Sequence, residues 1–160
     1  MNNGEFYLAD AIDVIEEILA GGGEFRMYPK GTSMLPLIVQ GRDSVVLRRN
    51  LDKPAKKNDI AFYRRDNGQF VLHRVMKVNK DGTYVMCGDN QVALELGIRG
   101  DQIIGCVSTL YKGDKVRNMR SLWYRMYLLF YCWLPFRKAT RFYGQIKSAV
   151  FRRIRRIRRS

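Results

Sequence analysis

With 160 residues, 46% of them apolar, the chain is long enough to bury the core of one domain with an appendage, but too short for two full domains. The formal net charge of +14 lies in the last third: residues 1–111 hold 14 Lys/Arg and 14 Asp/Glu, whereas residues 112–160 hold 15 Lys/Arg and a single acid, Asp114. One histidine and three cysteines without metal-ligand spacing argue against a zinc site and a disulfide framework, so we expect no metal and no other cofactor.

Residues 1–24 are predicted to form an N-terminal amphipathic helix followed by a glycine linker. Within residues 5–20 apolar side chains recur at helical spacing, and acidic residues occupy the opposite face. Gly21-Gly22-Gly23 then ends the helix. Because this segment is acidic and has no long apolar core, it resembles neither a signal peptide nor a membrane span.

Residues 25–118 are predicted to form a β-rich domain. Short apolar stretches alternate with turn signals such as Asp66-Asn67-Gly68 and Asp81-Gly82, a pattern that is typical of an all-β core. The expected strands are residues 25–29, 43–47, 60–63, 70–78, 83–87 and 103–111. The fold class is therefore mainly β, and we expect a partly closed, barrel-like core.

The candidate chemistry centres on residues 31–36, Gly-Thr-Ser-Met-Leu-Pro. Glycine and proline favour a tight, exposed corner here, with the Ser33 hydroxyl at its tip and Met34 packed beneath it. A serine hydroxyl is a poor nucleophile unless a base activates it. The chain has one histidine, His73, on the predicted strand 70–78, and this residue is the candidate base.

Four stretches of this region resemble the motifs of one family of serine peptidases, the signal peptidase I superfamily. GTSMLPLIVQGRD at 31–43 resembles the nucleophile motif, and KKNDIAFY at 56–63 resembles an intervening strand. VLHRV at 71–75 resembles the general-base motif of the Ser–His (endoplasmic-reticulum and archaeal) branch, and GDN at 88–90 resembles a third motif. The four stretches occur in family order. Asn58 replaces the usual glycine of the second stretch, and asparagine also tolerates a left-handed turn. The resemblance implies a signal-peptidase catalytic core that cleaves leader, signal-like or precursor peptides.

The resemblance also implies roles for particular residues. Ser33 would attack a peptide carbonyl, while His73 would take its proton and return it to the leaving amine. Two acids compete to orient His73: Asp89 lies within the third motif, and Glu95 lies six residues later, at the position where this branch often has an aspartate. We rank Asp89 slightly ahead of Glu95, with a plain Ser–His dyad as a third possibility. The non-catalytic interpretation of Asp89 is an Asx turn.

Substrate contacts are less sharply indicated. The Ser33 N–H is the natural oxyanion donor, and the Thr32 hydroxyl is a second candidate because Gly31 stands where many signal peptidases have a serine. An extended substrate is expected to add to the sheet edge near residues 25–29, with small side chains next to the scissile bond. The candidate substrate-binding residues are Phe25, Met27, Pro29 and Met34.

Residues 119–160 are predicted to form a helical tail that associates with a membrane. Residues 122–136 are apolar and aromatic but contain Arg125, and they are fewer than the roughly 20 residues that a span needs. An apolar stripe among clustered arginines follows, a pattern typical of binding to an anionic membrane surface. Without an export signal, peripheral attachment on the cytoplasmic side is expected. The alternatives are an anchor formed by residues 122–136, or packing of this segment on the β core.

Two other functions fit parts of the sequence. Self-cleaving regulators of the SOS-repressor type share the Ser-Met corner, but they use a lysine base and carry a preceding DNA-binding domain. A catalytically inactive β domain with a basic tail is the other alternative. The tail has no base-reading motif, so no specific nucleic-acid partner is expected. The expected partners are a peptide substrate and an anionic membrane.

Overall fold

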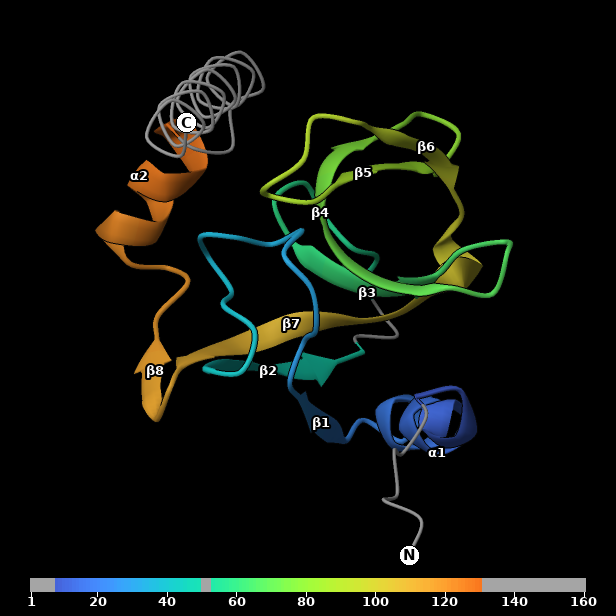
Figure 1. The fold of residues 1–160 in the computed structure, drawn as a ribbon. Helices are drawn as coiled ribbons and strands as arrows, with labels where there is room; N and C mark the ends of the chain where they lie inside the picture. Colours follow the sequence, from blue (N-terminus) through green and yellow to red (C-terminus); the bar gives the residue numbers. More distant parts are fainter. Residues whose placement is uncertain (1–7, 50–52, 131–160) are drawn as a thin grey trace, which may run out of the picture. The chain divides into compact units, whose positions relative to one another are not determined.

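The structure, a computed structural model, describes residues 8–49 and 53–130. The chain divides into two compact units, Met1–Met119 and Arg120–Ser160. The first unit contains α1 and the β-sheet, and the second contains α2 (Figure 1).

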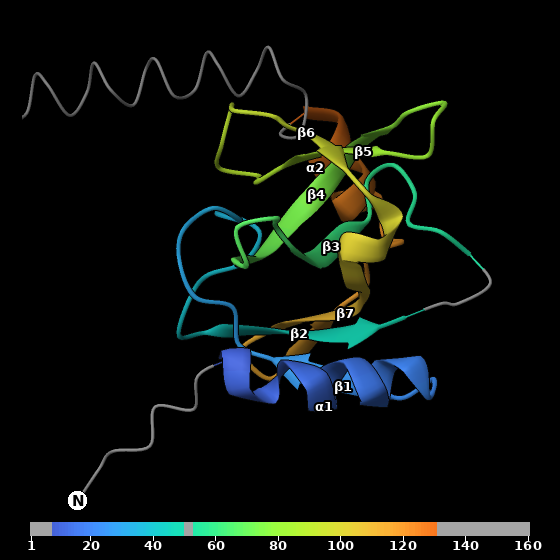
Figure 2. The ribbon, with the colours of Figure 1, turned by 90° about the vertical axis from the view of Figure 1, so that its right-hand side faces the viewer.

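Helix α1 (Leu8–Ala20) is amphipathic, as its periodicity predicts. Ile12, Ile15 and Leu19 are buried, and the helix packs against β1 and β7 on one side of the sheet (Figure 2). The helix ends at the three glycines, where the Gly23 N–H donates to the Ile18 carbonyl and Gly22 adopts φ +78°. The predicted first turn, residues 5–7, lies outside the described residues.

The first unit is built on one antiparallel sheet. Its strands are β1 (Glu24–Met27), β2 (Asp43–Arg48), β3 (Ile60–Arg64), β4 (Phe70–Val78), β5 (Tyr84–Cys87), β6 (Glu95–Ile98), β7 (Ile103–Lys112) and β8 (Lys115–Arg117). The spatial order is β1-β2-β7-β3-β4-β5-β6, and β8 pairs with β7. The prediction of a mainly β fold is confirmed.

The predicted partial closure of the sheet is wrong. Figure 1 shows β3 to β6 curling round, but the end strands β1 and β6 belong to one open path and do not pair with each other. Both are four-residue strands, so each offers few hydrogen bonds for closure. Strands β6 and β8 and the 3₁₀ turn Gly100–Gln102 are absent from the sequence prediction.

The concave part of the sheet holds a compact apolar cluster. Its buried members are Ala61, Tyr63, Val75, Tyr84, Met86 and Ile98, contributed by β3, β4, β5 and β6. In the middle of β4, Leu72, His73, Arg74 and Val75 are all buried, so both faces of this strand are covered there. His73 lies in this covered stretch, and its ring is in edge contact with that of Tyr63 of the cluster, with centroids 6.2 Å apart.

Helix α2 (Leu122–Phe130) belongs to the second unit. The Ser121 hydroxyl accepts a hydrogen bond from the Tyr124 N–H at 3.3 Å, and the rings of Trp123 and Tyr127 stack with centroids 5.8 Å apart. Several large apolar side chains are exposed, including Leu122, Leu129 and Phe130. Neither helix in residues 8–49 and 53–130 has the length and apolar content that a membrane crossing requires. The predicted tail beyond residue 130 lies outside the described residues.

Candidate active site

The segment around Ser33 forms the predicted tight corner between β1 and β2. Gly31 adopts φ +91°, a conformation that side-chain-bearing residues rarely take, and its N–H donates to Gln40 Oε1 at 2.6 Å. The Leu35 N–H donates to the Thr32 carbonyl at 3.2 Å, which closes the turn around Ser33. Ser33 itself remains partly exposed, so its hydroxyl is open to a ligand.

A buried charge pair holds the far side of this corner. Lys112 Nζ, at the end of β7, donates to Asp43 Oδ2 at 3.0 Å and also to the carbonyls of Pro36 and Leu37. Burial opposes ionisation of Asp43, but hydrogen bonds from Arg42, the Val39 N–H and Lys112 outweigh it and hold the pKa of the carboxyl well below its usual value. The corner is thus tied to β2 and β7 by contacts that the sequence does not indicate.

The GDN turn, residues 88–90, holds the near side of the corner. The Asn90 N–H donates to the Ser33 carbonyl at 2.7 Å, and Asn90 Nδ2 donates to the Thr32 carbonyl at 3.1 Å. A Cβ on Gly88 would lie 2.7 Å from the Ser33 carbonyl oxygen, so only glycine allows this approach. The third motif therefore fixes the backbone of the candidate nucleophile.

Asp89 forms a buried ion pair with Arg74. Arg74 Nε donates to Oδ1 at 2.7 Å and Nη2 donates to Oδ2 at 2.6 Å, and both side chains are fully buried. Arg74 Nη1 also donates to the carbonyl of Asn58, which adopts the left-handed conformation expected from the sequence, φ +78°. Asp89 therefore ties the GDN turn to β4.

Glu95, at the start of β6, is the acid that lies against His73. Its Oε1 is 3.0 Å from His73 Nδ1, whereas Asp89, which ranks ahead of it from the sequence, pairs with Arg74. The longer glutamate side chain spans the distance from the edge strand β6 to β4. Because a carboxylate only accepts, the neutral imidazole carries its proton on Nδ1 and presents the lone pair on Nε2.

Two further residues, Tyr63 and Arg65, donate hydrogen bonds to the Glu95 carboxylate. Tyr63 OH donates to Glu95 Oε2 at 2.9 Å and lies 3.3 Å from His73 Nδ1. Arg65 Nε donates to Oε2 at 2.8 Å and Arg65 Nη2 donates to Oε1 at 2.5 Å. Neither Tyr63 nor Arg65 is a candidate from the sequence, because each is part of an ordinary strand and hairpin pattern.

The ionisation of His73 follows from this environment. Burial is the main cause that lowers the pKa of His73 from its ordinary value of 6.5; Glu95 acts in the opposite direction and the Arg65 charge adds to the lowering. Burial tends to raise the pKa of Glu95, but the hydrogen bonds from Arg65 and Tyr63 and the charges nearby lower it. At neutral pH the pair is therefore a neutral imidazole beside a carboxylate.

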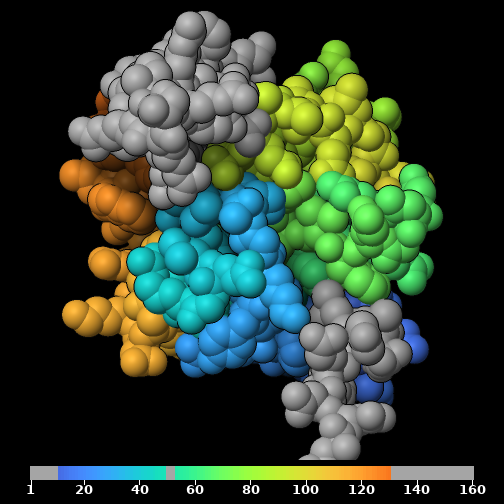
Figure 3. All heavy atoms as spheres, in the orientation of Figure 1, coloured from blue at the N-terminus to red at the C-terminus, as the bar shows by residue number. Residues whose placement is uncertain are grey.

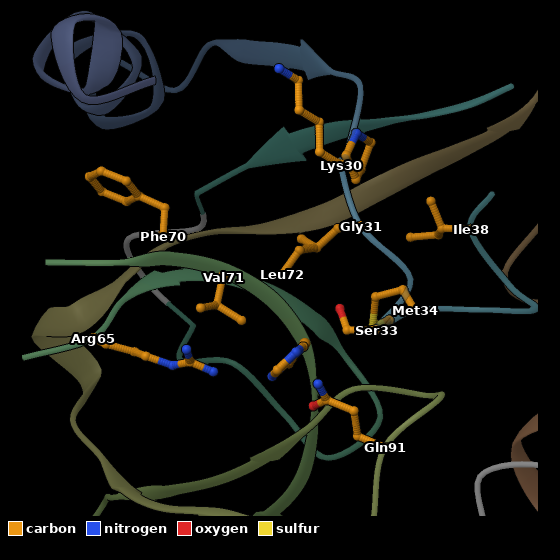
Figure 4. Close-up of a pocket in the computed structure, with 12 residues that line it drawn as sticks. Lys30, Gly31, Ser33, Met34, Ile38, Arg65, Phe70, Val71, Leu72 and Gln91 are labelled. Carbon is orange, nitrogen blue, oxygen red and sulfur yellow. The ribbon is translucent and has the colours of Figure 1, made fainter. Parts of the chain in front are cut away.

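Ser33 and His73 line one pocket of about 250 Å³. Figure 4 shows Ser33, Arg65 and Gln91 converging on it, and Figure 3 shows the corner, in light blue and cyan, beside the β3–β4 hairpin, in green. The remaining lining residues are Pro29, Lys30, Gly31, Met34, Ile38, Phe70, Val71 and Leu72.

The structure thus brings some of the predicted site residues to this pocket and not others. Pro29 and Met34 line it, whereas Phe25, Met27 and Thr32 do not. In the part of the chain that is described, no hydrogen bond joins Ser33 to His73, and no group of three His, Cys, Asp or Glu residues has the arrangement of a metal site.

Comparison with protein-family models, with curated protein sequences and with solved structures finds no match for this chain. The site must therefore be interpreted from its own geometry. It combines a hydroxyl on a rigid exposed corner with a buried imidazole whose Nδ1 faces a carboxylate, and both line one pocket. This is the set of groups that nucleophilic acyl transfer requires.

Proposed function

We propose that this protein is a serine endopeptidase of the signal-peptidase type, with Ser33 as nucleophile and His73 as general base. The observation that carries the proposal is the His73–Glu95 contact of 3.0 Å behind a pocket that Ser33 shares with His73. We infer that the open sheet is the catalytic core of this peptidase type. The order of the sequence motifs supports this inference.

The mechanism follows from the hydrogen-bond positions. The Ser33 oxygen attacks the carbonyl carbon of the scissile peptide bond as its proton passes to His73 Nε2. The Ser33 N–H stabilises the oxyanion of the tetrahedral intermediate. Collapse of the intermediate breaks the carbon–nitrogen bond, and His73 returns the proton to the leaving amine. Water then hydrolyses the acyl-enzyme by the same route, with Glu95 stabilising the transient imidazolium.

The pocket indicates how a peptide would bind. Its walls are mixed: Met34, Ile38 and Val71 contribute apolar side chains, whereas Lys30, Arg65 and Gln91 contribute polar ones. An extended peptide would lie along the segment that leads from β1 to Ser33, because β1 is an end strand of the sheet. The preference for small residues next to the scissile bond rests on the resemblance to signal peptidases.

The decisive test replaces the two candidate catalytic residues. Ser33→Ala and His73→Ala should each lower kcat by at least ~10³-fold against a library of precursor-like peptides, and the double variant should lose little more because the two residues act as a unit. Ser108→Ala, on β7, serves as the control and should cleave normally. Near-normal cleavage by His73→Ala would refute the assignment of the base.

We also propose that the second unit attaches the enzyme to an anionic membrane surface. Apolar side chains of α2 are exposed, and residues 120–160 carry 12 Lys/Arg and no acid. Exposed aromatic and aliphatic side chains bind the interface of a bilayer, and basic residues near the surface each contribute about 1 kcal/mol against anionic lipid.

A further inference from the structure

We propose that Tyr63 and Arg65 are positioning residues that hold Glu95 in the one orientation that orders the imidazole of His73. The consequence for catalysis rests on the proposed peptidase function, whereas the consequence for the imidazole itself does not. The sequence gives neither residue a role at the site, and both act on the imidazole through Glu95.

The first observation is that both carboxylate oxygens of Glu95 accept hydrogen bonds. Its Oε2 accepts from Tyr63 OH and from Arg65 Nε, at 2.9 and 2.8 Å, and its Oε1 accepts from Arg65 Nη2 and faces His73 Nδ1. A planar guanidinium that donates to both oxygens sets the plane of the carboxylate. The Tyr63 hydroxyl then selects which oxygen faces the imidazole.

The second observation is that β6 alone does not fix this carboxylate. β6 is a four-residue end strand that pairs only with β5, and its register with β5 shifts between Tyr84 and Met86. Leu96, the next residue, is 70% exposed. Such a short edge strand has few ladder hydrogen bonds, so Tyr63 and Arg65 supply the contacts that orient Glu95.

The third observation is that Tyr63 is rigid. It is fully buried in the apolar cluster, and it pairs with Val71 on β4 and Ile103 on β7. Burial is the main cause that raises the pKa of its hydroxyl, so Tyr63 stays a protonated donor at every pH at which the protein would work. Tyr63 therefore supplies a fixed hydrogen-bond donor for a side chain on a short edge strand.

Three charged side chains act on the imidazole of His73. Glu95 from β6, Arg65 from the β3–β4 hairpin and Asp89 from the GDN turn all act on the imidazole, and Asp89 is itself paired with Arg74 of β4. Arg65 is the only member of this set that both binds Glu95 and lines the pocket. Without the Arg65 charge, the negative charge of Glu95 acts on the imidazole with less compensation, and the pKa of His73 should be higher.

The test uses nuclear magnetic resonance of the intact chain, because one histidine makes the imidazole signals unambiguous. The ¹⁵N shifts report which ring nitrogen carries the proton, and a pH titration reports its pKa. In Arg65→Gln the pKa of His73 should rise and the Nδ1–H form should lose population, and Arg65→Lys should fall between this variant and the wild type. In Tyr63→Phe the Nδ1–H form should lose population.

Matched controls separate positioning from general damage. Tyr84→Phe removes a hydroxyl from the same buried cluster, and Arg64→Gln removes the neighbouring exposed cation; both should leave the His73 signals unchanged. Wild-type His73 signals in both Tyr63→Phe and Arg65→Gln would overturn the proposal. Should Tyr63→Phe fail to fold, Arg65→Gln decides by itself, since Arg65 lies at the surface of the hairpin.

Activity gives the second readout. Tyr63→Phe should lower kcat about tenfold with KM unchanged, a part of the about 10²- to 10⁴-fold that general-base catalysis supplies. Arg65→Gln should lower kcat by a similar factor, and a change in its KM would report the loss of a side chain that also lines the pocket. If Ser33→Ala shows that the chain is not a serine peptidase, the spectroscopic result still decides whether Tyr63 and Arg65 position His73. The two failures are therefore distinguishable.

Discussion

His73 shows how a single side chain is tuned by burial and by its neighbours. The imidazole is 2% exposed, and its burial together with Arg65 outweighs the attraction of Glu95, so that its pKa lies below 6.5. With this shift His73 is unprotonated at neutral pH, which is the state that its proposed role as general base requires. The same shift links the ionisation of His73 to the stability of the fold.

The pH dependence tests this shift. The unfolded chain binds a proton at His73 below about pH 6.5, whereas the folded protein binds it only at lower pH. The free energy of unfolding should therefore decrease as pH falls below 6.5, by at most about 1.4 kcal/mol per pH unit from this group, until pH reaches the folded pKa. Urea unfolding between pH 5 and 7 should show this slope in the wild type, and His73→Gln should lack it. An identical slope in both proteins would contradict the lowered pKa.

At the scale of elements, the site depends on a turn that packs against a corner. The GDN turn is anchored to β4 through the Asp89–Arg74 pair and binds the Thr32 and Ser33 carbonyls through Asn90. Ser33, the proposed nucleophile, is thus held by an element that lies far from it in the sequence. Gly88 makes this contact possible, because there is no room for a Cβ between the turn and the corner.

Gly88→Ala should therefore impair the site. The new Cβ would meet the Ser33 carbonyl oxygen at 2.7 Å, and the backbone of the corner or of the turn must move. A displacement of about 1 Å at a nucleophile costs on the order of 10²-fold in rate, so kcat should fall by roughly that factor and Tm should decrease. Gly100→Ala is the control, since its nearest neighbour would lie at 4.0 Å. Equal kcat values for the two variants would show that the turn does not set the position of Ser33.

At the scale of the whole molecule, charge and apolar surface are divided between two regions. Residues 1–111 are electrically balanced, whereas the region from residue 112 onward is strongly basic. In α2 the side chains of Leu122, Leu129 and Phe130 are 73%, 67% and 59% exposed, which is costly in water and favourable at a lipid interface. In our proposal, catalysis belongs to the first unit and membrane attachment to the second.

Vesicle binding tests the attachment. The full chain should co-sediment with vesicles that contain phosphatidylserine at low salt, and high salt or alkaline carbonate should release it because surface electrostatics are screened. Replacing Leu122, Leu129 and Phe130 with glutamine should weaken binding. The matched control replaces Leu94 and Leu96, which are exposed near β6, and should bind normally. Retention until detergent is added would instead indicate a transmembrane anchor.

Local patterns in the sequence determined much of the fold. Helical periodicity predicted α1, and turn signals predicted six of the strands to within a few residues, because both depend on neighbours close in the chain. The left-handed Asn58 and the corner around Ser33 were also predicted, since the residue types restrict the backbone there. β6 was missed because a four-residue strand that contains Gly97 has no alternating pattern.

Only the tertiary structure decided which acid reaches His73. Both Asp89 and Glu95 are plausible from the sequence, but Asp89 pairs with Arg74 and Glu95 reaches Nδ1. That outcome depends on the register shifts where β5 pairs with β4 and with β6. The contacts of Tyr63 and Arg65 with Glu95 could not be predicted from the sequence either. The order in which strands pair is set by long-range packing, and no short stretch of sequence encodes that order.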